Sequence, residues 1–486
     1  MTRVVVVGAG VGGLACALRL ARAGHEVSVV EQGEAPGGKC ARVERDGFRF
    51  DAGPSLLTMP WLVRELLGDR VELVAVEPVT RYRFADGTSV ELSADLPRAL
   101  EALESWAPGA GEDWARFLRI CAGMWRGSLP VLSGPPPWPP RRPAADAPPP
   151  DPRALLRVRP WHTLRTLARA TIRDPRLRLV VERFATYAGA DPRRAPAALA
   201  VAGYVEHAFG AWHVRGGIYA IVEALAEALR EAGGELRCGV RAHAVQLAGG
   251  ATAALWGGRG ARGRVTGVRT SAGWLAADAV VFNGDAPSPR ERSLSGFALL
   301  VGLRWREPGR THHEIRFPAD YDAEFDDVFR ARRPVRDPTL YLAASWVSDP
   351  GEAPADCENL FVLANAPSGS VDWDAEGPRY ESTLLAALGL SPGRVAFVMR
   401  RTPADLERLT GACGGAIYGV APHGRLGTLR RPPNAVTGVR GLWRVGGTTH
   451  PGGGLPLVLL GGRSVAGQID PAAGRLGCSS AGNRAR

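Results

Sequence analysis

Near the start of this chain of 486 residues stands the stretch Val4-Val5-Val6-Val7-Gly8-Ala9-Gly10-Val11-Gly12-Gly13. Four consecutive β-branched residues are typical of a strand that is buried on both faces of a parallel sheet. Gly8 to Gly13 match the pattern G-x-G-x-x-G, and residues 14–23 then place apolar side chains at helical spacing. A second strand-like run, residues 26–30, ends at Glu31. This order of strand, turn, helix and strand predicts an α/β fold with a Rossmann-type dinucleotide site.

Each glycine in the turn has a physical role. Gly8 permits the tight turn, Gly10 lets a pyrophosphate approach the backbone, and Gly13 lets the helix pack closely on the strand. Gly12 lies at the helix start, where free N–H groups and the positive end of the helix dipole favour phosphate. Glu31 follows Gly13 by 18 residues, which suits a carboxylate that accepts hydrogen bonds from ribose hydroxyls. A glycine loop in some other α/β protein is the alternative.

A second match to the glycine pattern occurs at residues 258–263. Only weak strand character precedes it, and a strand-like segment follows it in place of a helix. Because no helix is available to receive a phosphate, we expect a hairpin loop there. The chain therefore shows one dinucleotide site and no evident second site for a nicotinamide cofactor.

Two motifs follow Glu31 closely. They are Pro36-Gly37-Gly38-Lys39 and Asp51-Ala52-Gly53-Pro54-Ser55. Together with Glu31 they resemble the flavoenzymes with a glutathione-reductase-type FAD fold, and within these the phytoene desaturase group of carotenoid desaturases and isomerases. The resemblance implies that Gly37, Gly38, Lys39, Gly53 and Pro54 lie at the FAD. There Lys39, the only lysine of the chain, would offset flavin or phosphate charge; a solvated loop residue is the alternative.

The segment 441–458, GLWRVGGTTHPGGGLPLV, resembles the closing FAD-binding signature of carotenoid desaturases. Residues 442–445 read as a strand, and residues 455–469 read as a helix whose N-terminus would face the flavin and stabilise its anionic reduced form. Residues of this segment expected at the cofactor are Gly446, Gly447, Gly453, Gly454, Leu455 and Pro456. His450 is either a proton-transfer group or a histidine that holds the glycine-rich loop.

Further segments extend the resemblance through the middle of the chain. They are residues 183–192, 212–218 and 414–419. One segment departs from the family pattern, because residues 134–152 hold ten of the 39 prolines and cannot form a regular helix or central strand. We expect an extended loop or linker there.

The flavin motifs lie some 400 residues apart, which implies a discontinuous FAD-binding domain. We assign to it residues 1–76, 205–290 and 432–472. Within it we expect a helix over 217–231, strands within 234–247 and 264–282, and Val240 on a strand that passes the adenine. A mixed α+β substrate domain takes residues 77–204 and 291–431, and residues 473–486 are expected to form a flexible tail.

The formal net charge is +11, and 59 of the 60 Lys and Arg residues are arginine. Genome composition bias and attraction to an anionic membrane surface both account for this excess. No nucleic-acid motif accompanies it, so we expect no nucleic-acid partner. Arginines and apolar residues alternate over 153–178, which suggests either an amphipathic membrane-facing surface or an ordinary exposed basic helix.

The seven cysteines include no C-x-x-C pair and no short Cys/His cluster, so we expect neither a redox dithiol nor a metal site. Scattered cysteines suit a reducing cytoplasm. No apolar stretch approaches the ~18–20 residues that span a bilayer, which leaves peripheral membrane contact open.

The resemblance implies dehydrogenation of a long isoprenoid polyene in carotenoid biosynthesis, with oxygen or a quinone as electron acceptor. Residues 55–61 are expected to line part of a substrate tunnel. The sequence offers four candidate proton acceptors: Glu206, His207, Asp285 and His450. Alternatives are a carotenoid isomerase or saturase, an amine-oxidase-like enzyme, and a non-enzymatic prenyl-lipid carrier on the same fold.

Overall fold

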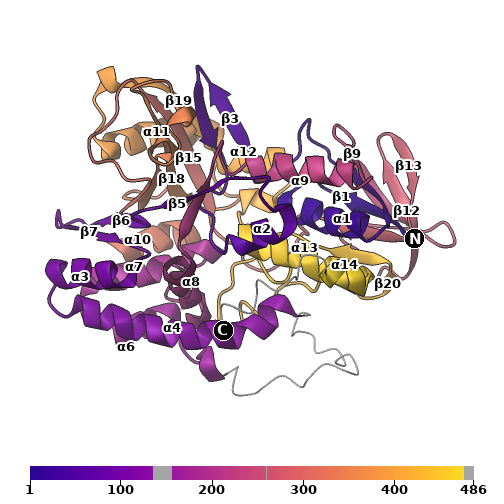
Figure 1. Cartoon of the computed structure of the whole chain (residues 1–486), viewed down its shortest axis with the longest axis horizontal. Helices are drawn as coiled ribbons and strands as arrows, with labels where there is room; N and C mark the ends of the chain where they lie inside the picture. Colours follow the sequence, from indigo (N-terminus) through magenta and orange to yellow (C-terminus); the bar gives the residue numbers. More distant parts are fainter. Residues whose placement is uncertain (135–155, 259, 476–486) are drawn as a thin grey trace.

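A five-stranded parallel sheet is built around β1 in the computed structural model of this chain, which describes residues 1–134, 156–258 and 260–475. Its strands, in order across the sheet, are β21 (Leu442–Arg444), β14 (Ala279–Phe282), β1 (Arg3–Val7), β2 (Glu26–Val30) and β9 (Glu235–Arg237). The predicted βαβ unit is therefore confirmed, and strands from distant parts of the sequence join it. Figure 1 shows this sheet and its helices on the same side of the molecule as the N-terminus.

Three helices cover this sheet: α1 (Val11–Arg22), α9 (Ala220–Glu231) and α13 (Leu455–Ile469). Helix α1 starts directly after Gly10 and packs against both α9 and α13. Val4, Val5 and Val6 are at most 2% exposed, as a strand covered on both faces requires. Helix α13 has the predicted bounds, whereas α9 begins three residues later than predicted, after a turn at Gly216 and Gly217.

A small sheet lies beside the parallel one; its strands pair antiparallel except β20, which pairs parallel with β12. Its members are β10 (Ala242–Leu247), β11 (Thr252–Ala253), β12 (Gly263–Thr270), β13 (Gly273–Ala276) and β20 (Val439–Arg440). The glycine-rich segment 258–263 connects β11 to β12, and its described residues contain no helix. The hairpin prediction is wrong in detail, because β11 and β12 each pair with β10 and not with each other.

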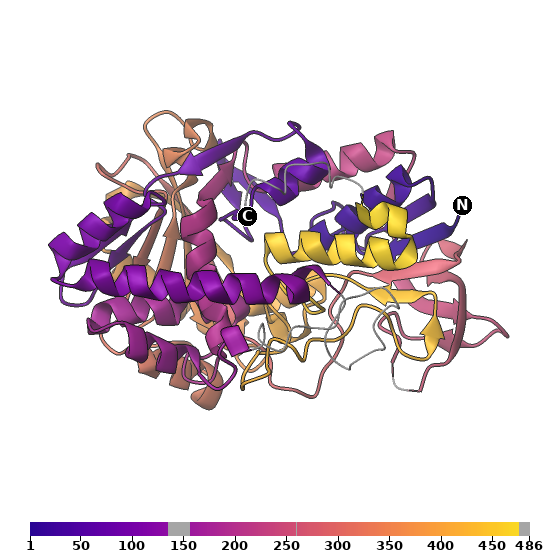
Figure 2. The same cartoon turned by 60° about the horizontal axis from the view of Figure 1, so that its bottom comes forward.

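The other half of the molecule contains a seven-stranded mixed sheet, as the predicted α+β architecture requires (Figure 1). Its strands, in order, are β19 (Val395–Arg401), β15 (Ser295–Leu303), β18 (Glu358–Ala366), β17 (Leu340–Ala343), β16 (His313–Arg316), β6 (Thr80–Arg83) and β7 (Ser89–Leu92). The helices of this half are α3 (Leu96–Trp106), α4 (Ala110–Ser133), α6 (Leu164–Thr171), α7 (Pro175–Arg183), α8 (Val201–Phe209), α10 (Tyr321–Asp326), α11 (Trp373–Leu388) and α12 (Pro403–Thr410). In Figure 2 the long helix α4 reaches toward α13 of the first half, and the two helices are in contact.

Short elements connect the two halves. They are β3 (Arg42–Arg45), β4 (Phe48–Asp51), α2 (Trp61–Leu67), β5 (Leu73–Val76) and β8 (Ala211–Val214). Strands β3 and β4 form a hairpin, and β5 pairs with β8. The domain boundaries drawn from the sequence stay a prediction.

Two predictions of local structure need correction. Val240 lies between β9 and β10 and not on a strand. The C-terminal tail was predicted to start at residue 473, but residues 473–475 belong to helix α14 (Pro471–Arg475). The rest of that tail, and the proline-rich segment except Gly134, lie outside the described residues.

Candidate active site

A cavity of about 520 Å³ lies over the turn between β1 and α1. We call it the glycine-lined cavity. Of the 17 residues predicted at the cofactor, these 15 line it: Gly8, Gly10, Gly12, Glu31, Gly37, Gly38, Lys39, Gly53, Pro54, Val240, Gly446, Gly447, Gly453, Gly454 and Leu455. The remaining two lie close by, since Gly13 packs against Gly8 and Pro456 lines a neighbouring cavity. The fold thus gathers motifs from both ends of the chain around one space.

Several glycines at this cavity leave no room for a side chain. A Cβ at Gly13 would lie 2.4 Å from the carbonyl oxygen of Gly8, and a Cβ at Gly37, where φ is +126°, would lie 2.2 Å from that of Cys40. The Asn283 amide donates to the Gly8 carbonyl at 3.0 Å and lies 2.9 Å from where a Cβ of Gly10 would be. Because no side chain covers this turn, a ligand can approach its backbone N–H groups closely. The turn therefore fits the pyrophosphate of a dinucleotide. Asn283 was not predicted as a site residue, although it fixes this turn.

Glu31 occupies one end of the glycine-lined cavity and is 9% exposed. Its Oε2 accepts from the Ala9 N–H at 2.7 Å, and its Oε1 accepts from the Gly33 N–H at 2.9 Å. Each carboxylate oxygen retains a second lone pair, so the group can still accept from ribose hydroxyls. The Val240 N–H donates to the Glu31 carbonyl at 2.8 Å, which places Val240 at the same end.

Lys39 is not a solvated loop residue. Its Nζ forms an ion pair with Asp285 at 2.9 Å and donates to the carbonyls of Ile417 at 2.9 Å and Ala416 at 3.3 Å. Asp285 offsets much of the lysine charge, so the charge available to a flavin is smaller than expected from the sequence. Asp285 lines the glycine-lined cavity, where this ion pair with Lys39 holds its side chain.

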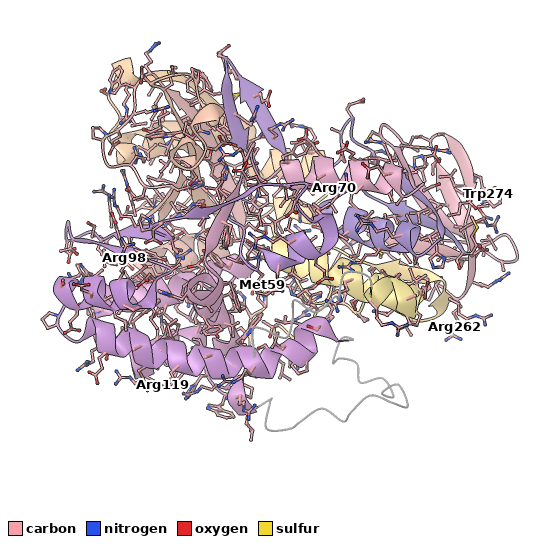
Figure 3. The ribbon with its side chains drawn as sticks, viewed as in Figure 1. Met59, Arg70, Arg98, Arg119, Arg262 and Trp274 are labelled. Atoms are coloured by element: carbon pink, nitrogen blue, oxygen red, sulfur yellow. The ribbon has the colours of Figure 1, made fainter. Side chains whose placement is uncertain are left out.

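A second cavity, of about 570 Å³, adjoins the first, and we call it the apolar cavity. The two cavities share a wall formed by Gly53, Pro54, Leu363, Tyr418, Gly453, Gly454 and Leu455. Of the predicted tunnel segment, Ser55, Leu56, Thr58 and Met59 line the apolar cavity. Figure 3 shows Met59 between the two halves of the molecule.

A buried polar group lies among the mostly apolar residues that line this cavity. The Tyr187 hydroxyl donates to Glu206, and the Arg183 guanidinium lies 3.7 Å from the same carboxylate. Arg183 also donates to the Tyr82 hydroxyl at 2.9 Å. Burial raises the pKa of Glu206, and the Arg183 charge opposes that shift. Of the four candidate proton acceptors, Glu206 and His450 line the apolar cavity.

His207 points elsewhere and has a structural role. Its Nε2 accepts a hydrogen bond from the Trp114 indole N–H at 2.9 Å, so the neutral ring carries its proton on Nδ1. Burial lowers the pKa of His207 to about 4. The residue is absent from the described lining of both cavities.

The His207 environment predicts a loss of stability in acid. In the unfolded chain a histidine binds its proton near pH 6.5, but folded His207 binds it only near pH 4. The unfolded state therefore holds more protons over that window, and the free energy of unfolding falls by roughly 3 kcal/mol as the pH drops through it. His207→Gln keeps an acceptor for Trp114 and should show a smaller drop between pH 7 and pH 4 in urea unfolding. An equal drop in both proteins would contradict this assignment.

His450 also fits the structural alternative. Its Nε2 donates to the Gly134 carbonyl at 3.1 Å, and its own carbonyl accepts from the Asn434 amide at 2.8 Å. Burial lowers its pKa. The neighbouring Arg431, which the sequence did not single out, donates to the Gly447 carbonyl at 2.9 Å and lines the apolar cavity. Burial lowers the pKa of Arg431 to about 10, so it stays charged at neutral pH.

Comparisons with known proteins identify the family of this chain. Residues 11–288 match the family described as flavin containing amine oxidoreductase. Over 96% of its length the chain is 32% identical to the zeta-carotene-forming phytoene desaturase of Myxococcus xanthus and covers 93% of it. It is 34% identical, over the same share, to the hydroxyneurosporene desaturase of Rhodobacter capsulatus and covers 97% of that protein.

The fold has solved counterparts as well. An oxidoreductase from Methanosarcina mazei matches 95% of this chain and 99% of its own with a TM-score of 0.61 at 17% identity. At that identity the match supports the fold alone, and the function rests on the sequence relatives. The chain belongs to the flavin-containing amine oxidoreductase family, and within it to the FAD-dependent carotenoid desaturases.

Proposed function

We propose that this chain is an FAD-dependent desaturase of a carotenoid or a related long isoprenoid polyene. The observation that carries the proposal is the wall shared by the two cavities. On one side of it lies a glycine cradle for a dinucleotide, and on the other a long apolar space. The names of the relatives support a polyene as the substrate class.

The residues that would hold FAD follow from the glycine-lined cavity. We assign the pyrophosphate to the turn from Gly8 to Gly13, the ribose to Glu31, and the flavin ring to the shared wall at Gly53 and Leu455. FAD, when bound, would supply the acceptor for one hydride, which carries two electrons, from an allylic carbon of the polyene. Helix α13 starts at Leu455, and its positive end stabilises negative charge at that position.

The protein aligns the polyene and keeps water away from it. Apolar side chains from several elements line the apolar cavity: Leu56, Met59, Val131, Leu132, Val158, Phe184, Leu199, Val201, Val205, Ile315, Leu363 and Leu457. When the polyene is held against the shared wall, its reacting carbon and the flavin are already in position, so their reaction no longer depends on a random encounter. Desaturation also removes a proton from the neighbouring carbon, and we propose Glu206 as its acceptor, held in place by Arg183 and Tyr187.

Glu206→Gln tests this assignment. The amide keeps the size of the side chain and can still accept from Tyr187, but it cannot take up a proton. We expect turnover to fall on the order of 100-fold, which is the usual contribution of a general base, with normal FAD content. The exposed Glu44→Gln serves as the control. Unchanged turnover in Glu206→Gln would remove Glu206 from the chemistry.

A product analysis tests the proposed function as a whole. The purified protein is incubated with phytoene or with a hydroxylated carotene, in the presence of oxygen or of a quinone, and the products are separated by chromatography. A desaturase yields a product with more conjugated double bonds. An isomerase would yield a product of unchanged mass, a saturase one with fewer double bonds, and a carrier only bound substrate; each of these outcomes would contradict the proposal.

We further propose that the mouth of the apolar cavity rests on a membrane from the cytoplasmic side. No helix in the described part of the chain is long and apolar enough to cross a bilayer. Exposed apolar side chains lie next to residues that line the cavity: Leu129, Leu156, Trp161 and Leu426. The six described cysteines are all unpaired, in keeping with a reducing compartment.

We propose that apolar side chains, and not the arginines of residues 153–178, make the main contact with the membrane. Arg165 pairs with Glu182 and Asp322, and Arg173 pairs with Asp113, so much of that charge is neutralised within the protein. Replacing Leu156 and Trp161 by serine should lower binding to liposomes about tenfold or more, since each side chain contributes ~1.5–3 kcal/mol when buried. The control is Trp274→Ser, at an exposed residue of β13 far from the cavity (Figure 3). Equal binding by all three proteins would contradict an apolar docking site at the mouth.

A further inference from the structure

A buried group of acidic and histidine side chains lies where β4, β8 and the turn at residues 350–352 meet. His213 of β8, Asp349 and Glu352 each offer a ligand atom, and these three atoms lie within 4.8 Å of one another. His213 is 1% exposed, Glu352 is fully buried and Asp349 is 7% exposed. None of the three residues lines either cavity in the described structure, so the chemistry proposed above does not use them.

Polar atoms in this group lack partners. Among the described residues, neither ring nitrogen of His213 has a hydrogen-bond partner, and Glu352 Oε1 has none either. The closest approach between them is 3.6 Å, from His213 Nε2 to Glu352 Oε1. Buried polar atoms are normally satisfied, and an unsatisfied carboxylate oxygen in the interior is costly. His213 Nε2 and Glu352 Oε1 therefore face each other in the interior without a hydrogen bond to any described residue.

The charges in this group do not balance. Asp51, at the end of β4, adds a third carboxylate: a Cβ at Gly217 would lie 3.0 Å from Asp51 Oδ1 and 3.3 Å from Glu352 Oε1. Among the described residues, Arg215 is the one guanidinium that forms an ion pair with any of the three, and it reaches Asp349 at 3.4 Å. Three carboxylates beside one guanidinium, which also pairs with Glu72, leave an excess of negative charge that a cation would offset.

Hydrogen bonds hold each of the three carboxylates in place. Asp349 Oδ2 accepts from the Gly216 N–H at 2.8 Å, and Asp51 Oδ2 accepts from the Ile218 N–H at 2.8 Å. The second oxygen of Glu352 accepts from the Ser345 hydroxyl. These bonds fix the orientation of each carboxylate, as the outer partners of metal-binding carboxylates do.

We propose that His213, Asp349 and Glu352 bind one divalent transition-metal ion of the Zn²⁺ type. One imidazole nitrogen with two carboxylate oxygens is a donor set for zinc and its neighbours, whereas Ca²⁺ and Mg²⁺ prefer oxygen alone. In a tetrahedral site with bonds of ~2.0–2.1 Å the ligand atoms stand roughly 3.4 Å apart, so the ion draws the three side chains slightly inward. His312 packs against His213 with the two ring centroids 5.0 Å apart, outside the group of three ligands.

The ion has a structural role at this position. It ties β8 to the turn that carries Asp349 and Glu352, beside β4, which leads directly into Gly53 and Pro54 of the shared wall. No short sequence motif announces such a site, because His213 lies more than 130 residues before Asp349 and Glu352. This proposal therefore replaces the expectation, drawn from the sequence, that the chain has no metal site.

Metal analysis of the FAD-loaded protein tests the proposal. The protein is stripped with a chelator, refilled with Zn²⁺ alone, dialysed and measured by elemental analysis and thermal unfolding. We expect about one zinc per chain and a higher unfolding midpoint, because an ion that binds only the folded state stabilises it. Zinc that dialyses away and leaves the midpoint unchanged would overturn the proposal without need of any variant.

Substitutions locate the bound ion. Both His213→Gln and Glu352→Gln should lose the retained zinc and its effect on the unfolding midpoint. The control His243→Gln, at an exposed histidine of β10, should keep both. Circular dichroism confirms that the two variants fold. Retention of a full equivalent of zinc by a folded His213→Gln protein would show an adventitious ion only and would contradict the site.

Discussion

Gly13→Ala is expected to yield a protein with less than about a tenth of the wild-type FAD content. The new Cβ would lie 2.4 Å from the Gly8 carbonyl oxygen of the turn and 2.8 Å from the amide nitrogen of Asn283, whose hydrogen bond to Gly8 holds the turn. The turn must open to accept it, and the cradle for the pyrophosphate is lost. Backbone strain of ~1–3 kcal/mol at such a site corresponds to one or two powers of ten in affinity. The flavin absorbance per chain of the purified protein is the measurement.

Gly123→Ala is the matched control. Gly123 lies within α4, has a helical backbone, and a Cβ there would meet no atom within 4 Å. This variant should bind FAD normally and be slightly more stable, since alanine favours a helix over glycine. Full FAD content in Gly13→Ala would show that the cofactor lies elsewhere.

Ala202→Trp is expected to abolish most desaturation while leaving FAD in place. Ala202 lies on α8 and lines the apolar cavity but not the glycine-lined cavity. An indole there takes up space that the polyene needs, and misplacing a substrate by about 1 Å already costs on the order of 100-fold. We expect kcat/KM to fall by at least that factor, with unchanged flavin absorbance per chain.

The same substitution on the outer face of the neighbouring α6 provides the control. Ala170 is exposed, so Ala170→Trp adds equal bulk without entering the apolar cavity. Its activity should match the wild type. If Ala202→Trp were as active as Ala170→Trp, the polyene would not occupy the apolar cavity, and a different path to the shared wall would be needed.

The βαβ unit and helix α13 were predictable because their signals are local. Gly8 to Gly13 directly link a buried strand to the helix that follows, and Glu31 ends the next strand. The closing signature gave the bounds of α13 for the same reason. Local patterns do not show that the two ends of the chain form one cavity. The resemblance to a known family predicted it.

The polar groups of the apolar cavity were not predictable in this way. Glu206 was a candidate from its residue type alone, and its partners Arg183 and Tyr187 come from other elements. Arg431 donates to the Gly447 carbonyl only because the loop between them folds back, and no local sequence pattern indicates that fold. His207 lies next to Glu206 in the sequence, yet one helical step turns it toward Trp114 and away from the cavity. Which of two neighbours faces a cavity depends on packing that a single sequence does not display.

The central claim is that the apolar cavity presents a polyene to FAD at the shared wall. An anaerobic single turnover tests it most directly: the FAD-loaded protein is mixed with one equivalent of the polyene, and flavin and polyene absorbance are followed together. We expect the flavin to bleach in step with the formation of one new carbon–carbon double bond per FAD, and we expect neither change in Ala202→Trp. A polyene that lengthens without flavin bleaching, or a flavin that stays oxidised beside bound polyene, would contradict the account.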